Sequence, residues 1–276
     1  MLAKRIITGI VGAALTIFII YEGEWLYFGL VTLLALLGWR EYVQLLTKLK
    51  ANLTVIFGFV WIIALFSAYW FTSVKLIALL CVILLSWVLL RTVLFHSSVK
   101  PVDSAYSLYG LLYLGCGFLA MLALRHGQMG TLISGLFSTE LIDPSRFIVF
   151  LMIFSTWASD TFAFAVGKAT GKNKLCPAIS PGKTVEGFVG GLIGTILTAL
   201  IFSVIFKFSL LHALAIGVII SIMAPLGDLV ESILKRVCQV KDSGNLIPGH
   251  GGILDRFDSL LFTAPAVFVY LLCVAG

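Results

Sequence analysis

Acidic and basic side chains are concentrated near the C-terminal end of an otherwise apolar sequence. Asp228, Glu231 and Lys235 recur there at intervals of three and four residues, so one face of a helix would carry all three. Asp255 and Asp258 are also three residues apart and would share a face of the last helix. Two such carboxylate pairs, joined by a loop, would bind Mg²⁺, a hard cation that takes oxygen ligands and substrate phosphates. The spacing therefore favours a nucleotide-metal site.

The segment 241–252 between the carboxylate pairs contains four glycines and a proline, which forbid a regular helix. Glycine lets the backbone approach a ligand closely and present amide N–H groups to phosphate. His250 would add a hydrogen-bond donor or a proton carrier, although a single histidine is more often structural. For any one charged residue here, a role in membrane topology or at a helix end is the competing explanation.

A second polar segment contains Gly182, Lys183 and Thr184, a tripeptide also found in Walker A phosphate loops. That interpretation fails because Pro177 stands where the Walker A pattern needs its first glycine. The segment is instead expected to form a turn that delivers Lys183 and Thr184 to the start of a helix. The amide N–H groups and the dipole at a helix N-terminus favour an anion.

Asp160 lies inside an apolar run beside Ser159. A carboxylate at the centre of a membrane helix costs about 2.5 to 3.5 kcal/mol, a cost usually met by a partner or a water-filled cavity. Asp160 should therefore face the protein interior, either at the polar site or against a structural partner. The overlapping GxxxG spacings of Gly187, Gly190, Gly191 and Gly194 indicate close helix packing, and we assign them no chemistry.

The composition places these residues in lipid. The chain is 60% hydrophobic and 12% charged, with a mean hydropathy of +1.09, which excludes both a soluble domain and a disordered one. The five cysteines are far apart and form no CxxC pair, so they are expected to be free thiols. The first apolar run ends without a small-residue cleavage pattern and is therefore expected to be a retained span rather than a signal peptide.

We expect an all-α polytopic membrane bundle with about nine helices and a polar active-site cavity. The expected spans are approximately 6–21, 25–46, 53–72, 75–95, 106–124, 146–167, 185–207, 210–226 and 256–275. Pro225 is expected to end or kink the eighth span. Residues 1–276 would form a single membrane domain, in which 1–140 are scaffold helices with possible homodimer contacts. Residues 146–276 would be catalytic, with polar loops at 167–184 and 227–256.

Basic residues fix the expected orientation. With the N-terminus in the cytoplasm, only Lys75, Arg125, Arg146 and Lys207 of the 19 lysines and arginines lie outside. This asymmetry follows the positive-inside rule and places both polar loops in the cytoplasm. The net charge of +6 is thus attributed to topology and anionic lipid rather than to a nucleic-acid partner. A bacterial inner membrane is the expected location.

The C-terminal residues resemble the signature of the CDP-diacylglycerol synthases, also called phosphatidate cytidylyltransferases. The resemblance covers 27 residues, from Ser232 to Asp258, and is highly specific. It is carried by Ser232, Leu234-Lys235-Arg236, Lys241-Asp242, Gly244, Ile247-Pro248, His250-Gly251-Gly252-Ile253 and Asp255-Arg256-Phe257-Asp258. The Ser180-Pro-x-Lys-Thr-Val-Glu-Gly stretch and the Ser159-Asp160 pair are similar to two further family features. Gly182 departs from the family, which often has lysine there.

This resemblance implies that phosphatidate attacks the α-phosphorus of CTP, releasing pyrophosphate and leaving CDP-diacylglycerol in the membrane. Mg²⁺, with a possible second cation, would be the cofactor. Asp228 and Asp255 are the expected metal ligands, supplemented by Asp258 or Asp160. The expected catalytic residues are Asp228, Lys235, Arg236, His250, Asp255 and Arg256. The expected substrate-binding residues are Ser180, Lys183, Thr184, Glu186, Lys241, Asp242, Gly251 and Gly252.

Three alternatives compete with this assignment. A CTP-dependent polyprenol or phytol kinase is similar in its C-terminal membrane helices and would transfer the γ-phosphate instead. A transporter or channel would explain Asp160 and the glycine-rich helices, but the charged residues crowd at one membrane face instead of at the midplane. A non-catalytic scaffold would leave the cluster of aspartates and His250 unexplained.

Overall fold

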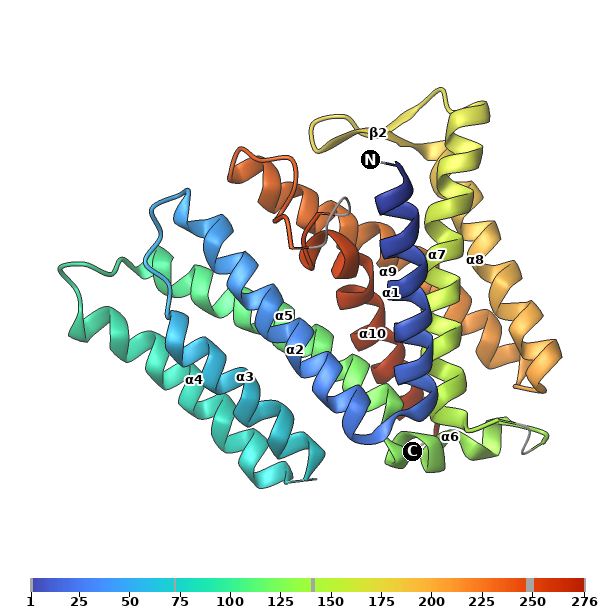
Figure 1. The fold of residues 1–276 in the computed structure, drawn as a ribbon, viewed down its shortest axis with the longest axis horizontal. Helices are drawn as coiled ribbons and strands as arrows, with labels where there is room; N and C mark the ends of the chain where they lie inside the picture. Colours follow the sequence, from blue (N-terminus) through green and yellow to red (C-terminus); the bar gives the residue numbers. More distant parts are fainter. Residues whose placement is uncertain (1, 72, 140–141, 247–250, 276) are drawn as a thin grey trace.

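The protein is a bundle of helices in the computed structural model, which describes residues 2–71, 73–139, 142–246 and 251–275 (Figure 1). Within these ranges, seven helices are long and apolar enough to cross a membrane. They are α2 (Glu24–Thr47), α4 (Val74–Leu94), α5 (Pro101–Arg125), α7 (Pro144–Thr170), α8 (Val185–Phe206), α9 (Leu210–Val237) and α10 (Leu254–Ala275). The expected all-α polytopic membrane bundle is confirmed.

Two further apolar helices, α1 (Leu2–Glu22) and α3 (Val55–Trp70), coincide with the first and third expected spans. Each of the nine expected spans therefore corresponds to a helix in the described part of the chain, although the number of membrane crossings stays a prediction. Two short helices, α6 (Gly127–Ile133) and the 3₁₀ turn η1 (Ser134–Leu136), were not expected and fill the connection from α5 to α7. All five cysteines are free, as predicted.

Helix α9 does not end at Pro225 but continues through it to Val237, so the polar loop expected at 227–256 is helical as far as Val237. A proline removes only one backbone donor, and membrane helices tolerate this where neighbouring groups satisfy the freed backbone. Beyond the proline, the i,i+4 ion pair between Glu231 and Lys235 supports the additional turns. This extension carries both side chains toward the start of α10.

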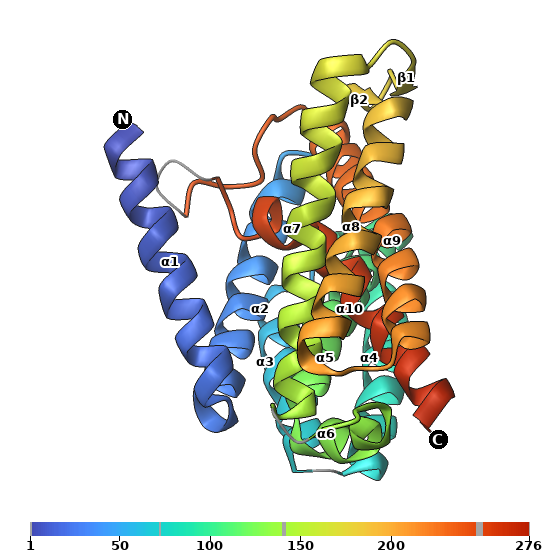
Figure 2. The same ribbon diagram turned by 90° about the vertical axis from the view of Figure 1, so that its right-hand side faces the viewer.

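The polar segment before α8 is a hairpin rather than a simple turn. Strands β1 (Lys174–Cys176) and β2 (Ser180–Thr184) pair antiparallel, with Lys174 opposite Thr184. The helix directions alternate so that this hairpin and residues 238–246 lie at one end of the bundle, which we call the site end (Figures 1 and 2). Helix α6 and the C-terminal end of α10 lie at the other end of the bundle, away from the hairpin (Figures 1 and 2).

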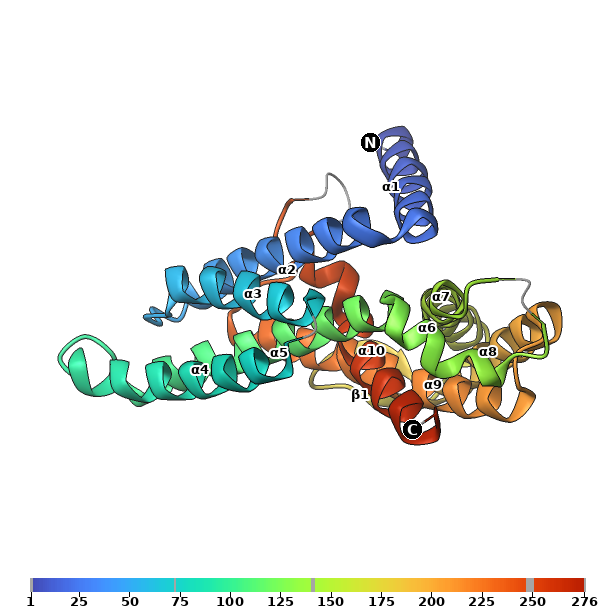
Figure 3. The same cartoon turned by 90° about the horizontal axis from the view of Figure 1, so that it is seen from below.

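Helices α5 and α10 lie between two groups of helices. Seen from below, α3 and α4 extend to one side, and α7, α8 and α9 pack on the other (Figure 3). The densest packing joins α7 to α8, where a Cβ on Gly190 would meet Val166 and one on Gly194 would meet the ring of Phe162. Close helix packing at the GxxxG spacings is thus confirmed, and it brings Asp160 of α7 near the start of α8.

Arg125 joins three helices at the opposite end. Its guanidinium donates to the carbonyl oxygens of Ile20 and Tyr21 at the end of α1, at 2.8 and 3.3 Å, and to Ser145 Oγ on α7 at 3.0 Å. It also forms an ion pair with Asp143 at 3.4 Å. Burial disfavours the charged form of Asp143, but the bonds from Ser145 and the nearby Arg125 lower its pKa below the ordinary value. These hydrogen bonds of Arg125 hold the end of α1 against α5 and α7.

The glycine packing gives a first prediction. Gly194→Ala should lower the thermal unfolding temperature of the detergent-solubilised protein, because the added methyl group overlaps the Phe162 ring and pushes α8 from α7. Gly29→Ala is the matched control, since a Cβ at that exposed helical position meets nothing within 4 Å. That variant should be neutral or more stable by up to about 1 kcal/mol. Equal effects of the two substitutions would contradict the packing argument.

Candidate functional site

Three carboxylates from two helices meet at the site end. Asp228 and Glu231 of α9 and Asp258 of α10 each offer an oxygen atom within 4.8 Å of the others. In the part of the chain that the structure describes, they are the one group of three acidic, histidine or cysteine side chains that could hold a metal ion. Gly227 permits this approach, because a Cβ there would lie 3.0 Å from the Cα of Ser259. We call these three residues the carboxylate cluster.

Two lysines carry positive charge to the carboxylate cluster. Lys183 Nζ of β2 lies 2.7 Å from Asp228 Oδ2, and Ser232 Oγ donates to the other oxygen of Asp228 at 3.2 Å. Lys235 forms an ion pair with Glu231, which is only 1% exposed. Apart from that ion pair, the Glu231 oxygens have no hydrogen-bond partner among the described residues. Such incompletely satisfied buried carboxylate oxygens suit a hard cation.

Asp255 is placed beside the carboxylate cluster and is already fully engaged. Its Oδ1 accepts from Lys235 Nζ at 2.8 Å. Its Oδ2 accepts from the backbone N–H and the hydroxyl of Ser243 and from the backbone N–H of Gly252, each at 2.9 Å. Asp255 therefore holds Ser243 and Gly252, two described residues of the glycine-rich segment 241–252, onto α10, and its role as metal ligand stays a prediction.

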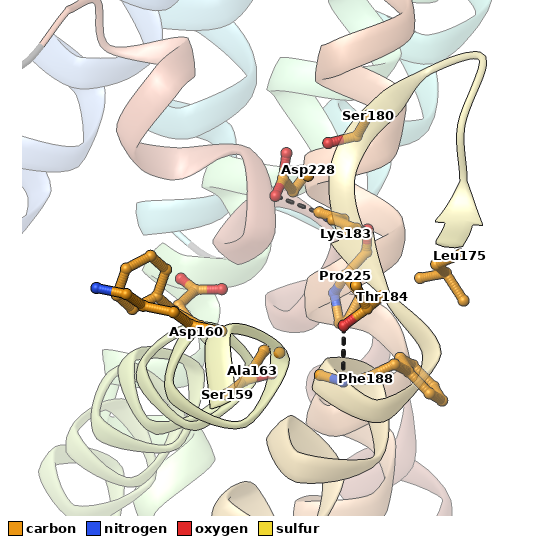
Figure 4. Close-up of a pocket in the computed structure, with 15 residues that line it drawn as sticks. Ser159, Asp160, Ala163, Leu175, Ser180, Lys183, Thr184, Phe188, Pro225 and Asp228 are labelled. Atoms are coloured by element: carbon orange, nitrogen blue, oxygen red, sulfur yellow. Dashed lines mark hydrogen bonds and ion pairs between the residues drawn. The ribbon is translucent and has the colours of Figure 1, made fainter. Parts of the chain in front are cut away.

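A cavity of about 500 Å³ opens beside Asp228, between α7, α8, α9 and the hairpin. Figure 4 shows Lys183 reaching from β2 to Asp228, with Asp160 of α7 in the wall of the same cavity. Asp160 thus belongs to the polar site, one of the two places left open by its sequence. The other walls are lined by Ser159, Ala163, Phe164, Gly167, Lys168, Leu175, Ser180, Gly182, Thr184, Gly187, Phe188 and Pro225.

The hairpin is held so that Lys183 faces this cavity. Thr184 Oγ1 accepts from the N–H of Gly187 at 3.1 Å and caps the start of α8. The carboxylate of Glu186 accepts from the backbone N–H groups of Lys172 and Asn173, at 3.1 and 3.2 Å. Thr184 and Glu186 therefore fix the hairpin in place, while their expected roles in substrate binding stay predictions, and only Thr184 of the two lines the cavity.

The remaining expected site residues are distributed more widely. Arg236 Nε donates to the carbonyl oxygen of Ile179 in the hairpin at 3.4 Å. Lys241, Asp242 and Arg256 are exposed and do not line the 500 Å³ cavity. Gly251 has a φ of +84°, a backbone conformation that favours glycine. His250 lies outside the described residues, so its expected role stays a prediction.

Glu41 was not expected near the site and lies on α2, in the half of the chain expected to be scaffold. Its Oε2 accepts from the backbone N–H of Leu254, at the start of α10, at 3.1 Å. The side chain is 4% exposed, and a Cβ on Gly252 would meet both Glu41 and Ser243. The cost of a carboxylate in an apolar run, applied to Asp160, could have singled out Glu41 as well.

Glu231 was recognised on the acidic face of α9 but was not assigned as a metal ligand. The signal was its spacing of three residues from Asp228, which places both carboxylates on one helical face. What the spacing could not reveal is which of the two aspartates of α10 joins them. The fold brings Asp258 to the carboxylate cluster and turns Asp255 toward the glycine-rich segment.

Comparison with known proteins adds an independent line of evidence. Residues 3–274 match the model of the cytidylyltransferase family. A phosphatidate cytidylyltransferase of Bacillus subtilis (strain 168) is 34% identical over 98% of this chain and 96% of its own. One of Staphylococcus aureus (strain COL) is 33% identical over 97% of this chain and 98% of its own. One of Staphylococcus haemolyticus is 37% identical over 74% of this chain and 72% of its own.

The contact of Glu41 with α10 gives a second prediction. Glu41→Ala leaves the buried N–H of Leu254 without its acceptor and should cost about 1 to 3 kcal/mol of stability, measured as a lower thermal unfolding temperature. Glu41→Gln keeps an acceptor oxygen at the same place and should lose less. Gln44→Ala, an exposed position one turn along α2, is the control. An Ala variant at Glu41 as stable as this control would show that the contact does not hold α10.

Proposed function

The chain belongs to the cytidylyltransferase family, and we propose that it transfers the cytidylyl group of CTP to phosphatidate in a membrane. A phosphate oxygen of phosphatidate bonds to the α-phosphorus of CTP, and the bond from that phosphorus to the pyrophosphate oxygen breaks. The products are CDP-diacylglycerol and pyrophosphate. The observation that carries the proposal is the meeting of the carboxylate cluster with Lys183 beside a cavity large enough for a ligand.

The cofactor in this proposal is Mg²⁺, held by Asp228, Glu231 and Asp258. Three carboxylates with oxygens within 4.8 Å of one another are the hard donors that this ion prefers. When bound, the ion supplies positive charge that neutralises the phosphates of CTP and orients them. Asp160, in the wall of the adjoining cavity, would supply an oxygen for a second cation. Asp255, predicted as a further metal ligand, holds Ser243 and Gly252 in place beside the carboxylate cluster.

The chain's own residues bind and position two anionic reactants. Lys183 lines the cavity and offers its ammonium group to phosphate oxygens. Lys235 forms ion pairs with Glu231 and Asp255, and these two ion pairs fix its positive charge beside the carboxylate cluster. Because phosphatidate and CTP repel each other, charge neutralisation and in-line positioning account for most of the catalysis in this proposal.

The lipid would occupy the apolar walls of the same cavity. Leu175, Phe164 and Phe188 line it together with the polar groups, and Phe164 is 71% exposed. A lipid entering sideways between helices would thus keep its acyl chains in an apolar environment while its phosphate reaches Lys183. The strong excess of basic residues expected on one side supports a cytoplasmic site in a bacterial inner membrane. A homodimer stays a prediction.

The decisive experiment follows labelled CTP. Purified protein incubated with phosphatidate, Mg²⁺ and CTP labelled at the α-phosphate should place the label in lipid. The γ-phosphate should leave with pyrophosphate, so label at that position should not enter lipid. Chelation of Mg²⁺ should abolish both the transfer of label to lipid and the release of pyrophosphate. Incorporation of the γ-label into lipid would instead identify a lipid kinase and overturn the proposal.

The different surroundings of Asp228 and Asp255 give a further prediction. Asp228→Asn should lower turnover at least about 100-fold, because it removes a proposed metal ligand, with little change in thermal unfolding. Asp255→Asn should lower both turnover and unfolding temperature, because it weakens four bonds that hold Lys235, Ser243 and Gly252. Near-normal turnover of Asp228→Asn would discard the metal assignment.

A further inference from the structure

Tyr113 has a buried hydroxyl group with no hydrogen-bond partner among the described residues. It lies on α5, where its ring packs against Phe262 of α10 at a centroid distance of 6.0 Å. Buried hydroxyl groups are ordinarily paired, since an unpaired one costs about 1 to 3 kcal/mol. Two other buried tyrosines follow this rule: Tyr27 donates to Met121 O at 3.1 Å and Tyr42 to Tyr106 O at 2.8 Å. Tyr113 therefore requires an explanation.

The surroundings of the Tyr113 hydroxyl supply one. Phe262 lies four residues after Asp258 on α10, so the ring of Tyr113 packs one helical turn from this member of the carboxylate cluster. The negative charges of Asp258, Glu231 and Asp228 also act on the hydroxyl. None of the three accepts a hydrogen bond from it in this structure. Helix α5 packs along α10, so the hydroxyl is held beside the cluster by the helix framework rather than by a bond of its own.

We propose that the Tyr113 hydroxyl forms a hydrogen bond with a ligand held in the carboxylate cluster, and is thus a further ligand-binding residue. Two ligand groups have the required chemistry: a phosphate oxygen of CTP, to which the hydroxyl would donate, and a water on the cation, from which it would accept. The inference rests on the proposed function, because that function places both groups in the cluster. The ligand then supplies the partner that the hydroxyl lacks among the described residues.

The test is Tyr113→Phe, which removes one oxygen atom and keeps the ring that packs on Phe262. Without ligands, this variant should unfold at the wild-type temperature or above it, because no hydrogen bond of the folded protein is lost. Its turnover of CTP and phosphatidate should fall about tenfold or more, as expected for loss of a hydrogen bond to a charged ligand. Tyr27→Phe is the matched control: it loses its bond to Met121, so stability should fall while turnover per folded molecule stays unchanged.

Thermal shifts separate the two ligand groups without relying on turnover. Mn²⁺ alone and Mn²⁺ with CTP, both without phosphatidate, should each raise the unfolding temperature of the wild type. A smaller rise for Tyr113→Phe with Mn²⁺ alone identifies the metal-bound water, and a smaller rise only when CTP is added identifies the phosphate oxygen.

Two outcomes would overturn the inference for Tyr113. One is wild-type turnover together with unchanged shifts in both ligand arms. The other is a loss of stability as large as that of Tyr27→Phe, with turnover falling only in proportion to the folded fraction. A wild-type protein that makes no CDP-lipid refutes the proposed function instead, and the thermal shifts still decide the role of Tyr113.

Discussion

The ammonium group of Lys235 pairs with acidic side chains from both helices where α9 meets α10. Lys235 lies against Glu231 on its own helix and 2.8 Å from Asp255 on the next. Charges at such buried positions are tolerated only when they are paired, and removing one partner leaves an uncompensated charge. Of the two carboxylates paired with Lys235, Glu231 belongs to the carboxylate cluster, and Asp255 accepts a hydrogen bond from Ser243 of the glycine-rich segment. Lys235 therefore couples the proposed metal site to the segment that borders it.

The N-terminal half of the chain takes part in this arrangement through Glu41. Its carboxylate on α2 accepts from the N–H of Leu254, a residue 213 positions away in the sequence. Close packing of Gly244 and Gly252 around that carboxylate ties the glycine-rich segment to α2 as well. The division into scaffold and catalytic halves, which stays a prediction, thus has a direct contact across it. Support for the site comes from both halves.

Much of this arrangement follows from local sequence, and the rest depends on tertiary contacts. Apolar length predicted the helices, the GxxxG spacings predicted the α7–α8 packing, and the spacing on α9 placed Asp228 and Glu231 together. The spacing could not decide whether Pro225 ends the helix before this face, and α9 runs through it because neighbouring groups in a bundle can satisfy the freed backbone. A hairpin as short as β1–β2 leaves almost no periodic signal. The partner of Glu41 lies 213 residues away, and Ser243 and Gly252, which bond to Asp255, lie in a segment without helical periodicity, so spacing along one helix could not predict these contacts.

The ion pair between Lys183 and Asp228 also links the two kinds of ligand in the proposed reaction. A cation held by the Asp228 carboxylate would compete with Lys183, which lies 2.7 Å from that carboxylate. Once displaced, the ammonium group is available to phosphate oxygens in the cavity that it already lines. A triphosphate bound by Lys183 would in turn leave Asp228 available to the cation, because coupling between two binding equilibria is reciprocal. The same lysine that balances the site's charge without ligands would thereby make cation and nucleotide bind together.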